Sequence, residues 1–215
     1  LHERTAGMIA ILDYGVGNLF SLRSSLTHLG LEAVVTADAQ TIRKADRLIL
    51  PGVGAFGDAM DKLSATGLVP VIREQAAQKP LLGICLGMQL LFEKSYEYGE
   101  HGGLGFAKGE VCPLEPDLKD KTLKVPQIGW NALDILRPNA MTEGLENGSY
   151  VYFVHSFMAK PSDENDLAAV TDYGTRVPAM VARGNLFGCQ FHPEKSGEVG
   201  LQMLRNFAKL TEVGK

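Results

Sequence analysis

The chain has 215 residues, of which 45% are hydrophobic and 21% are charged, and its formal net charge is −4. Such a composition is ordinary for one globular domain with a substantial core, and mild acidity without basic blocks gives no support for binding to nucleic acid or to anionic membranes. The three cysteines are too few and too scattered for a disulfide framework, which predicts a reducing, cytoplasmic location.

The first seven residues differ in character from the rest of the chain. Residues 1–7 lack the apolar core of a signal peptide, and an apolar run begins at Met8. We interpret residues 1–7 as a remnant of an expression vector and residues 8–215 as one domain. No apolar run approaches the length needed to span a bilayer.

The N-terminal half alternates short apolar runs with amphipathic segments. Strands are expected at residues 8–12, 31–36, 46–50 and 81–84, and helices at residues 19–29, 58–63 and 69–78. Strands that are apolar throughout and alternate with amphipathic helices indicate a parallel sheet with helices on both faces.

From about Gly103 onward the pattern changes to short β-type runs separated by turn residues. These runs cover residues 122–126, 132–136, 150–155, 168–171, 179–182 and 186–191. They predict antiparallel strands that extend the sheet, followed by a final helix at residues 198–210. The expected fold is therefore a single α/β domain of three layers, with a central, largely parallel sheet extended by antiparallel strands.

Cys85 lies in the most informative motif, because a G-x-C-x-G pattern follows an apolar strand and precedes a helix-forming stretch. This is a nucleophile elbow with a thiol in place of the usual hydroxyl, and Gly83 and Gly87 avoid clashes in the tight turn. The start of a helix favours the thiolate of Cys85, and the amide of Leu86 is placed to bind an oxyanion. A buried structural cysteine is the alternative, which the motif around His192 disfavours.

His192 and Glu194 supply the other two groups of a catalytic triad. Along the strand expected at residues 186–191, alternation would place His192 on the same face as Gln190, and the carboxylate of Glu194 would hold the imidazole in one tautomer. A thiol, an imidazole and a carboxylate are sufficient for acyl transfer through a thioester. A zinc site is disfavoured because strand alternation separates Cys189 from His192 and no Cys-x-x-Cys pair exists.

The glycine-rich loop at residues 51–57 matches the dinucleotide fingerprint G-x-G-x-x-G. It follows the third expected strand rather than the first, and no basic residue follows it, so nucleotide binding is the less favoured interpretation. Beside the elbow, the loop offers the amide of Gly52 or Val53 as a second oxyanion donor.

Together these motifs make the chain resemble the class I (triad) glutamine amidotransferases. The resemblance rests on residues 51–54, 83–89 and 191–194, and it extends from Met8 to the last expected helix. Four further motifs are typical of the glutaminase subunits of imidazole glycerol phosphate synthases, namely residues 13–18, 129–131, 152–156 and 191–196. The resemblance implies a flavodoxin-like glutamine amidotransferase domain at residues 8–215, without a cofactor or a metal.

The resemblance also implies residue roles. Cys85 matches the nucleophile, His192 the general acid and base, Glu194 its orienting partner, and Val53 and Leu86 the oxyanion hole. The residues that match the glutamine pocket are Gly52, Gln89, Glu97, Ser156 and Phe157. From the residues alone, Gln89 is also compatible with a helix surface and Glu97 with a solvated charge.

A partner is implied by the same resemblance. The family implies a (β/α)₈-barrel cyclase that forms a heterodimer with the glutaminase, takes up its ammonia, and makes imidazole glycerol phosphate and aminoimidazole carboxamide ribotide in histidine biosynthesis. The residues that match the family's interface are Asn18, Trp130, Tyr152 and Lys195. From the residues alone, Trp130 is also compatible with a core position and Lys195 with an ordinary surface position.

Two other functions remain compatible with the motifs. One is the glutaminase subunit of another synthase, such as anthranilate, aminodeoxychorismate or pyridoxal phosphate synthase. The other is a catalytically silent module that regulates a barrel enzyme. The intact set of Cys85, His192 and Glu194 argues against the silent module, because a regulatory scaffold needs no thiol on an elbow.

Overall fold

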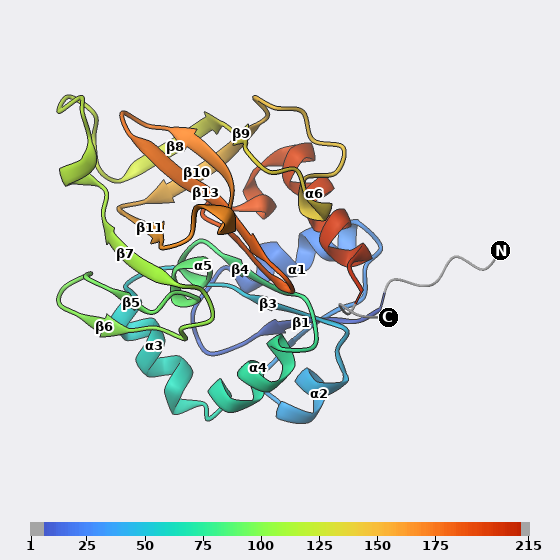
Figure 1. The fold of residues 1–215 in the computed structure, drawn as a ribbon. Coiled ribbons are helices and arrows are strands. Elements are labelled where there is room, and N and C mark those ends of the chain that lie inside the picture. Colours follow the sequence, from blue (N-terminus) through green and yellow to red (C-terminus); the bar gives the residue numbers. More distant parts are fainter. Residues whose placement is uncertain (1–6, 212–215) are drawn as a thin grey trace.

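A computed structural model describes residues 7–211, so six of the seven residues interpreted as a vector remnant lie outside the described part. An eight-stranded sheet runs through the domain in the order β2-β1-β3-β4-β14-β13-β12-β9 (Figure 1). Its strands are β1 Ile9–Leu12, β2 Ala33–Thr36, β3 Arg47–Leu50, β4 Leu81–Ile84, β9 Asp134–Ile135, β12 Leu167–Asp172, β13 Arg176–Arg183 and β14 Leu186–Cys189. The pairs from β2 to β14 are parallel, and β13, β12 and β9 continue antiparallel. The predicted fold class is confirmed.

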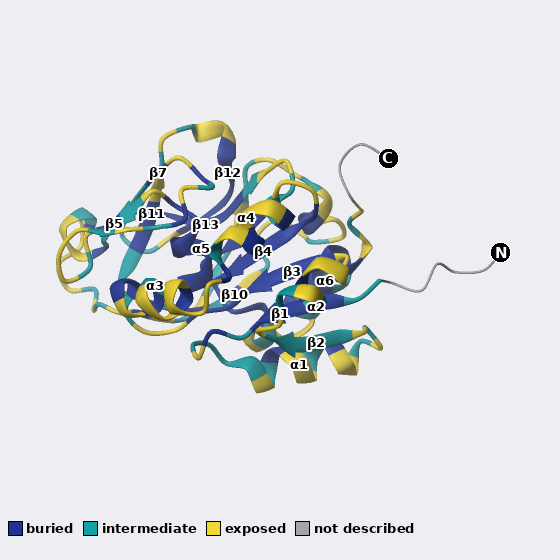
Figure 2. Ribbon diagram, turned by 90° about the horizontal axis from the view of Figure 1, so that it is seen from below, coloured by how far each residue is buried: buried dark blue, intermediate teal, exposed yellow. Residues whose placement is uncertain are grey.

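Helices cover both faces of this sheet, as expected. The first face carries α2 Ala39–Lys44, α3 Phe56–Ala65, α4 Val69–Ala76 and α5 Leu86–Leu90, and the second carries α1 Leu19–His28 and α6 Gly197–Lys209. The side chains of β1 alternate between the two faces of the sheet. Ala10 and Leu12 pack in the core under the first face, and Ile9 and Ile11 pack in the core under the second. Figure 2 shows the buried strands between helices whose outer sides are exposed.

Two smaller sheets stand beside the central one. β8 Gln127–Ala132 pairs with β10 Tyr150–His155, and a four-stranded sheet has the order β11-β7-β5-β6. The strands of the latter are β5 Lys94–Ser95, β6 His101–Gly102, β7 Gly109–Pro113 and β11 Phe157–Pro161. The strand expected at residues 150–155 therefore exists but does not extend the central sheet.

Three expected boundaries are wrong. Strands expected at residues 122–126 and 132–136 are replaced by β8 and by the two residues of β9. The last strand ends at Cys189, because the chain leaves the sheet there for a turn that leads to the 3₁₀ segment Pro193–Lys195.

The carboxyl ends of β3, β4 and β14 meet at one edge of the central sheet. Open parallel sheets place their binding sites at this edge.

Candidate active site

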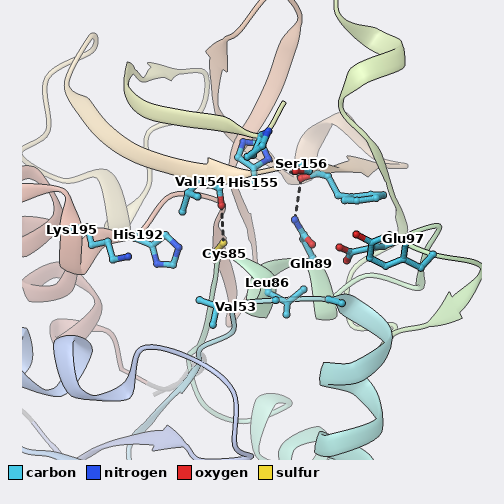
Figure 3. Close-up of a pocket in the computed structure, with 15 residues that line it drawn as sticks. Val53, Cys85, Leu86, Gln89, Glu97, Val154, His155, Ser156, His192 and Lys195 are labelled. Carbon is cyan, nitrogen blue, oxygen red and sulfur yellow. Dashed lines mark hydrogen bonds between the residues drawn. The ribbon is translucent and has the colours of Figure 1, made fainter. Parts of the chain in front are cut away.

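Cys85 lies at the carboxyl end of β4 and directly before α5, with a left-handed backbone (φ 53°) that is rare for a residue with a side chain. A β-carbon on Gly87 would overlap the carbonyl oxygen of Leu50, and one on Gly83 would lie 2.6 Å from the carbonyl oxygen of Gly87. The turn is as tight as the G-x-C-x-G pattern predicts. It directs the sulfur into a cavity at the sheet edge, where the side chain is largely buried (Figure 3).

His192 and Glu194 form a buried pair beside this cavity. Nδ1 of His192 lies 2.7 Å from Oε1 of Glu194, and the two side chains are each 3% exposed. His192 lines the same cavity as Cys85, whereas its Nε2 makes no hydrogen bond. A turn rather than strand alternation brings His192 to this place, because β14 has already ended at Cys189.

The electrostatic environment of His192 favours its charged form. Burial lowers the pKa of His192, but the neighbouring Cys85 sulfur and the Glu194 carboxylate outweigh burial and raise this pKa to about 9. A folded-state pKa above the unfolded value contributes stability that is complete below about pH 6.5 and is lost as the pH rises through about 9. The arrangement therefore supports an imidazolium beside the sulfur at neutral pH.

The cavity has a volume of about 550 Å³, which is in the range of small-molecule sites. Of the residues predicted for catalysis or glutamine binding, the following line it: Val53, Cys85, Leu86, Gln89, Glu97, Ser156, Phe157 and His192. Gly52 and Glu194 do not line it. Gly52 lies buried against α5, where a β-carbon would come within 2.9 Å of the Gly87 amide nitrogen.

Polar groups in the cavity are arranged in two parts. Cys85 and His192 lie toward one end, and Gln89 and Glu97 extend toward the other (Figure 3). Oε2 of Glu97 accepts a hydrogen bond from the Phe56 amide at 2.8 Å, and burial is the main cause of the raised pKa of Glu97. Neither Gln89 nor Glu97 is the freely solvated surface residue that its type alone would allow.

The four residues predicted for a partner interface fall into two groups. Trp130 and Tyr152 face each other across β8 and β10 with ring centroids 6.0 Å apart, and Nζ of Lys195 lies 5.9 Å from the Tyr152 ring. Trp130 is 53% exposed, so a core position for this residue is excluded. Lys195 also lines the cavity. Asn18 does not line it, and its side chain caps α1 by accepting from the Ser21 amide.

His155 lines the cavity and was not assigned a role from the sequence, although it lies in the motif at residues 152–156. Its Nδ1 lies 2.8 Å from the carbonyl oxygen of Phe157, and its Nε2 lies 2.9 Å from the side chain of Gln127. Burial is the main cause that lowers the pKa of His155 to about 4, so the ring is neutral at pH 7. His155 therefore builds the cavity wall as a neutral hydrogen-bonding group.

We predict that His155→Gln weakens the acid sensitivity of the fold. A folded-state pKa of about 4 against an unfolded value of 6.5 means that stability is lost as the pH falls from 6.5 toward 4. One proton taken up on unfolding corresponds to a slope of about 1.4 kcal/mol per pH unit in that window. Urea unfolding between pH 4.5 and 6.5 measures this slope. An unchanged slope in the variant would contradict the assignment.

Among residues 7–211, no group of three or more His, Cys, Asp or Glu side chains is arranged to hold a metal ion. In the same part of the chain, every helix is too short or too polar to cross a membrane.

Comparison with known proteins agrees with this geometry. The model of the glutamine amidotransferase class-I family matches residues 10–210. Two solved structures share the fold at 20% identity and a TM-score of 0.72: a glutamine amidotransferase, covering 94% of this chain and 99% of its own, and PurLQS from Thermotoga maritima, covering 93% and 96%.

Closer relatives carry the name imidazole glycerol phosphate synthase subunit HisH. The protein from Bacillus cereus is 50% identical over 97% of both chains, and that from Caldanaerobacter subterraneus is 48% identical over 94% of this chain and 98% of its own. A third, from Lactococcus lactis, is 49% identical over 93% and 96%. The chain therefore belongs to the class I glutamine amidotransferases and, within them, to the family of HisH subunits of imidazole glycerol phosphate synthase.

Proposed function

We propose that this protein hydrolyses the side-chain amide of glutamine to glutamate and ammonia, and that it supplies the ammonia to the cyclase subunit of imidazole glycerol phosphate synthase. The observation that carries the proposal is the cavity at the sheet edge. Into it open both a cysteine held at a helix N-terminus and a histidine paired with a buried carboxylate. Relatives that are 48–50% identical over nearly the whole chain support the choice among glutaminases.

In the first step the Cys85 sulfur attacks the amide carbon of glutamine, and the amide oxygen takes up the negative charge. The backbone amide of Leu86, the first residue of α5, is favourably placed to bind this oxyanion because it belongs to a helix N-terminus. Val53, which lines the same cavity (Figure 3), supplies the second amide of the oxyanion hole.

The collapse of this intermediate requires a proton on the leaving nitrogen. His192 donates it, so ammonia departs and a γ-glutamyl thioester remains on Cys85. His192 then takes a proton from water, the hydroxide attacks the thioester, and glutamate leaves as the sulfur regains its original state. Glu194 holds the imidazole through Nδ1 and leaves Nε2 free for both transfers.

The far end of the cavity suits the amino-acid part of glutamine. Glu97 offers a carboxylate to the α-ammonium group, and Gln89 offers its amide. The backbones of Ser156 and Phe157, which line the cavity, complete the pocket for the α-carboxylate region, whereas Gly52 lies buried against α5.

A partner is required because ammonia is mostly protonated in neutral water and is then no nucleophile. We infer a heterodimer in the cytoplasm with a (β/α)₈-barrel cyclase, which uses ammonia to form imidazole glycerol phosphate and aminoimidazole carboxamide ribotide. The relatives' name, subunit of imidazole glycerol phosphate synthase, supports this partner. Its docking surface comprises Asn18, Trp130, Tyr152 and Lys195.

The proposal is tested by measuring glutamate release from glutamine for the chain alone and for the chain mixed with a cyclase subunit that carries its ribotide substrate. We expect weak hydrolysis alone and a marked increase in the complex, because the glycine-rich loop at residues 51–54 would present the Val53 amide only when the partner is bound. If glutamine is hydrolysed neither by the chain alone nor by the chain with the cyclase, the glutaminase assignment is refuted. If the cyclase does not stimulate hydrolysis but an anthranilate synthase component does, the cyclase is not the partner.

We predict that Lys195→Glu weakens binding to the cyclase by roughly tenfold, or about 1.4 kcal/mol. The charge of Lys195 lies over the Tyr152 ring, which in turn packs against the exposed Trp130, so its reversal disturbs the centre of the proposed docking surface. Calorimetric titration with the cyclase measures the affinity. The matched control is Lys44→Glu, at the carboxyl end of α2 and away from the site edge, which should bind as the unchanged chain does.

A further inference from the structure

Gln190 performs none of the steps of the proposed reaction, yet its side chain lies between two residues of the site. It is fully buried directly after β14, where its backbone amide donates to the carbonyl oxygen of Ala179 on β13 at 2.9 Å. Its Nε2 lies 3.6 Å from the sulfur of Cys85, and its Oε1 lies 3.0 Å from Nε2 of Gln89. The side chain thus joins the nucleophile to a wall of the cavity.

The orientation of both amide groups follows from one backbone carbonyl. The carbonyl oxygen of Phe157 can only accept a hydrogen bond, so the group of Gln89 that faces it at 3.0 Å must be the NH₂ group. The second hydrogen of that NH₂ group then points to Gln190, which must accept it with its side-chain oxygen. Gln190 consequently has only its own NH₂ group left to direct at the sulfur of Cys85.

Two hydrogen-bonding contacts of the sulfur have opposite preferences. The carbonyl oxygen of Val154, 3.9 Å away, can accept only from the protonated thiol (Figure 3). The N–H of Gln190 can donate to either form, and its bond becomes stronger when the sulfur is negative, because hydrogen bonds to ions are stronger than those to neutral groups. When the thiol loses its proton to His192, the hydrogen bond to Val154 is therefore lost and the hydrogen bond from Gln190 becomes stronger.

We propose that Gln190 is a positioning residue of the glutaminase reaction. Its NH₂ group holds the Cys85 thiolate in place, and its carbonyl oxygen fixes the amide of Gln89 so that the oxygen of Gln89 is available to the substrate. The role of Gln190 in orienting Gln89 for the substrate rests on the proposed function. Its contact with Cys85 affects the reactivity of the thiol even when no glutamine is present.

The first experiment measures the rate at which iodoacetamide alkylates Cys85 in the full chain at fixed pH, followed by mass spectrometry of the peptide that contains Cys85. Gln190→Met fills a similar volume and removes both hydrogen bonds. Gln190→Glu keeps an oxygen for Gln89 but offers no amide N–H to the sulfur. We expect alkylation to be slower by about tenfold in both variants, since a hydrogen bond to a charged group has this effect.

The second experiment separates the two contacts in the complex with the cyclase. Gln190→Met is expected to lower kcat and raise KM for glutamine, whereas Gln190→Glu is expected to lower kcat with KM unchanged. Gln75→Met is the matched control, because Gln75 is also buried but lies on α4, and it should leave alkylation and kinetics unchanged.

Alkylation and kcat equal to those of the unchanged chain in both Gln190 variants would overturn the inference. An equal change in Gln75→Met would also overturn it, because the effect would then come from general loosening of the core. Failure of the proposed function is recognised separately, since the unchanged chain would then hydrolyse no glutamine with its partner while the alkylation difference would persist.

Discussion

Cys85→Ser is expected to reduce glutamate release from glutamine by about four orders of magnitude or more. The substitution exchanges one atom and preserves the shape of the turn, but a serine hydroxyl is a far weaker nucleophile than the sulfur of a cysteine. The reaction cannot form its thioester, so hydrolysis is lost at the first step. Coupled measurement of glutamate in the complex with the cyclase provides the rate.

The control for this variant is the same complex supplied with an ammonium salt in place of glutamine. The cyclase should then form its products at the rate seen with the unchanged chain, because the docking surface and the fold are intact. Substantial glutamine hydrolysis by Cys85→Ser would refute the assignment of the nucleophile. Failure of the ammonium-supplied reaction would show that the substitution acts through the complex instead.

Gly87→Ala is expected to destabilise the fold by about 3 kcal/mol and to abolish hydrolysis as well. The added methyl group would overlap the carbonyl oxygen of Leu50 and approach Pro51, both of which are backbone of β3 and the loop after it. Since neither atom is the end of a flexible side chain, α5 must move away from the sheet. That movement shifts Cys85 and the amide of Leu86 together.

Urea unfolding of Gly87→Ala measures the stability, and Gly102→Ala is its control. Gly102 has no atom within 4 Å of an added β-carbon and has no positive φ, so alanine there should be almost neutral. A Gly87→Ala variant as stable and as active as Gly102→Ala would mean that the elbow has room for a β-carbon after all.

The sequence predicted those parts of the fold that have strong local signals. The buried parallel strands and the helices α1, α3, α4 and α6 are confirmed, because continuous apolar runs and one-sided helices are visible in single segments. Helix α2 was not predicted, since its six residues place only Ile42 in the core. One apolar position leaves no helical period to detect.

The wrong boundary of β8 has a specific cause. In this strand the polar Gln127 is buried and bonded to His155, while Ile128 and Trp130 are 59% and 53% exposed. An apolar pattern that points to solvent cannot be recognised as a strand by looking for a buried face. Strands β7 and β11 were also missed, because their partners are far apart in the sequence and neither has a strong apolar run.

The candidate site could be predicted to a similar extent. The elbow, the histidine and the carboxylate have characteristic spacings. The structure brings the elbow and the histidine to one cavity and pairs the carboxylate with the histidine. Gln190 could not be singled out, because its importance depends on the turn after Cys189 and on a contact with a residue 105 positions away. His155 was likewise hidden, since a motif does not reveal that its ring is buried and neutral.

The left-handed backbone of Cys85 has a cost of its own. A residue with a β-carbon loses roughly 1–2 kcal/mol in this conformation relative to one that glycine would adopt freely. Glycine at position 85 would relieve this strain but would remove the proposed nucleophile. Under the proposed function, the thiol at this position serves the reaction at the expense of the stability of the fold.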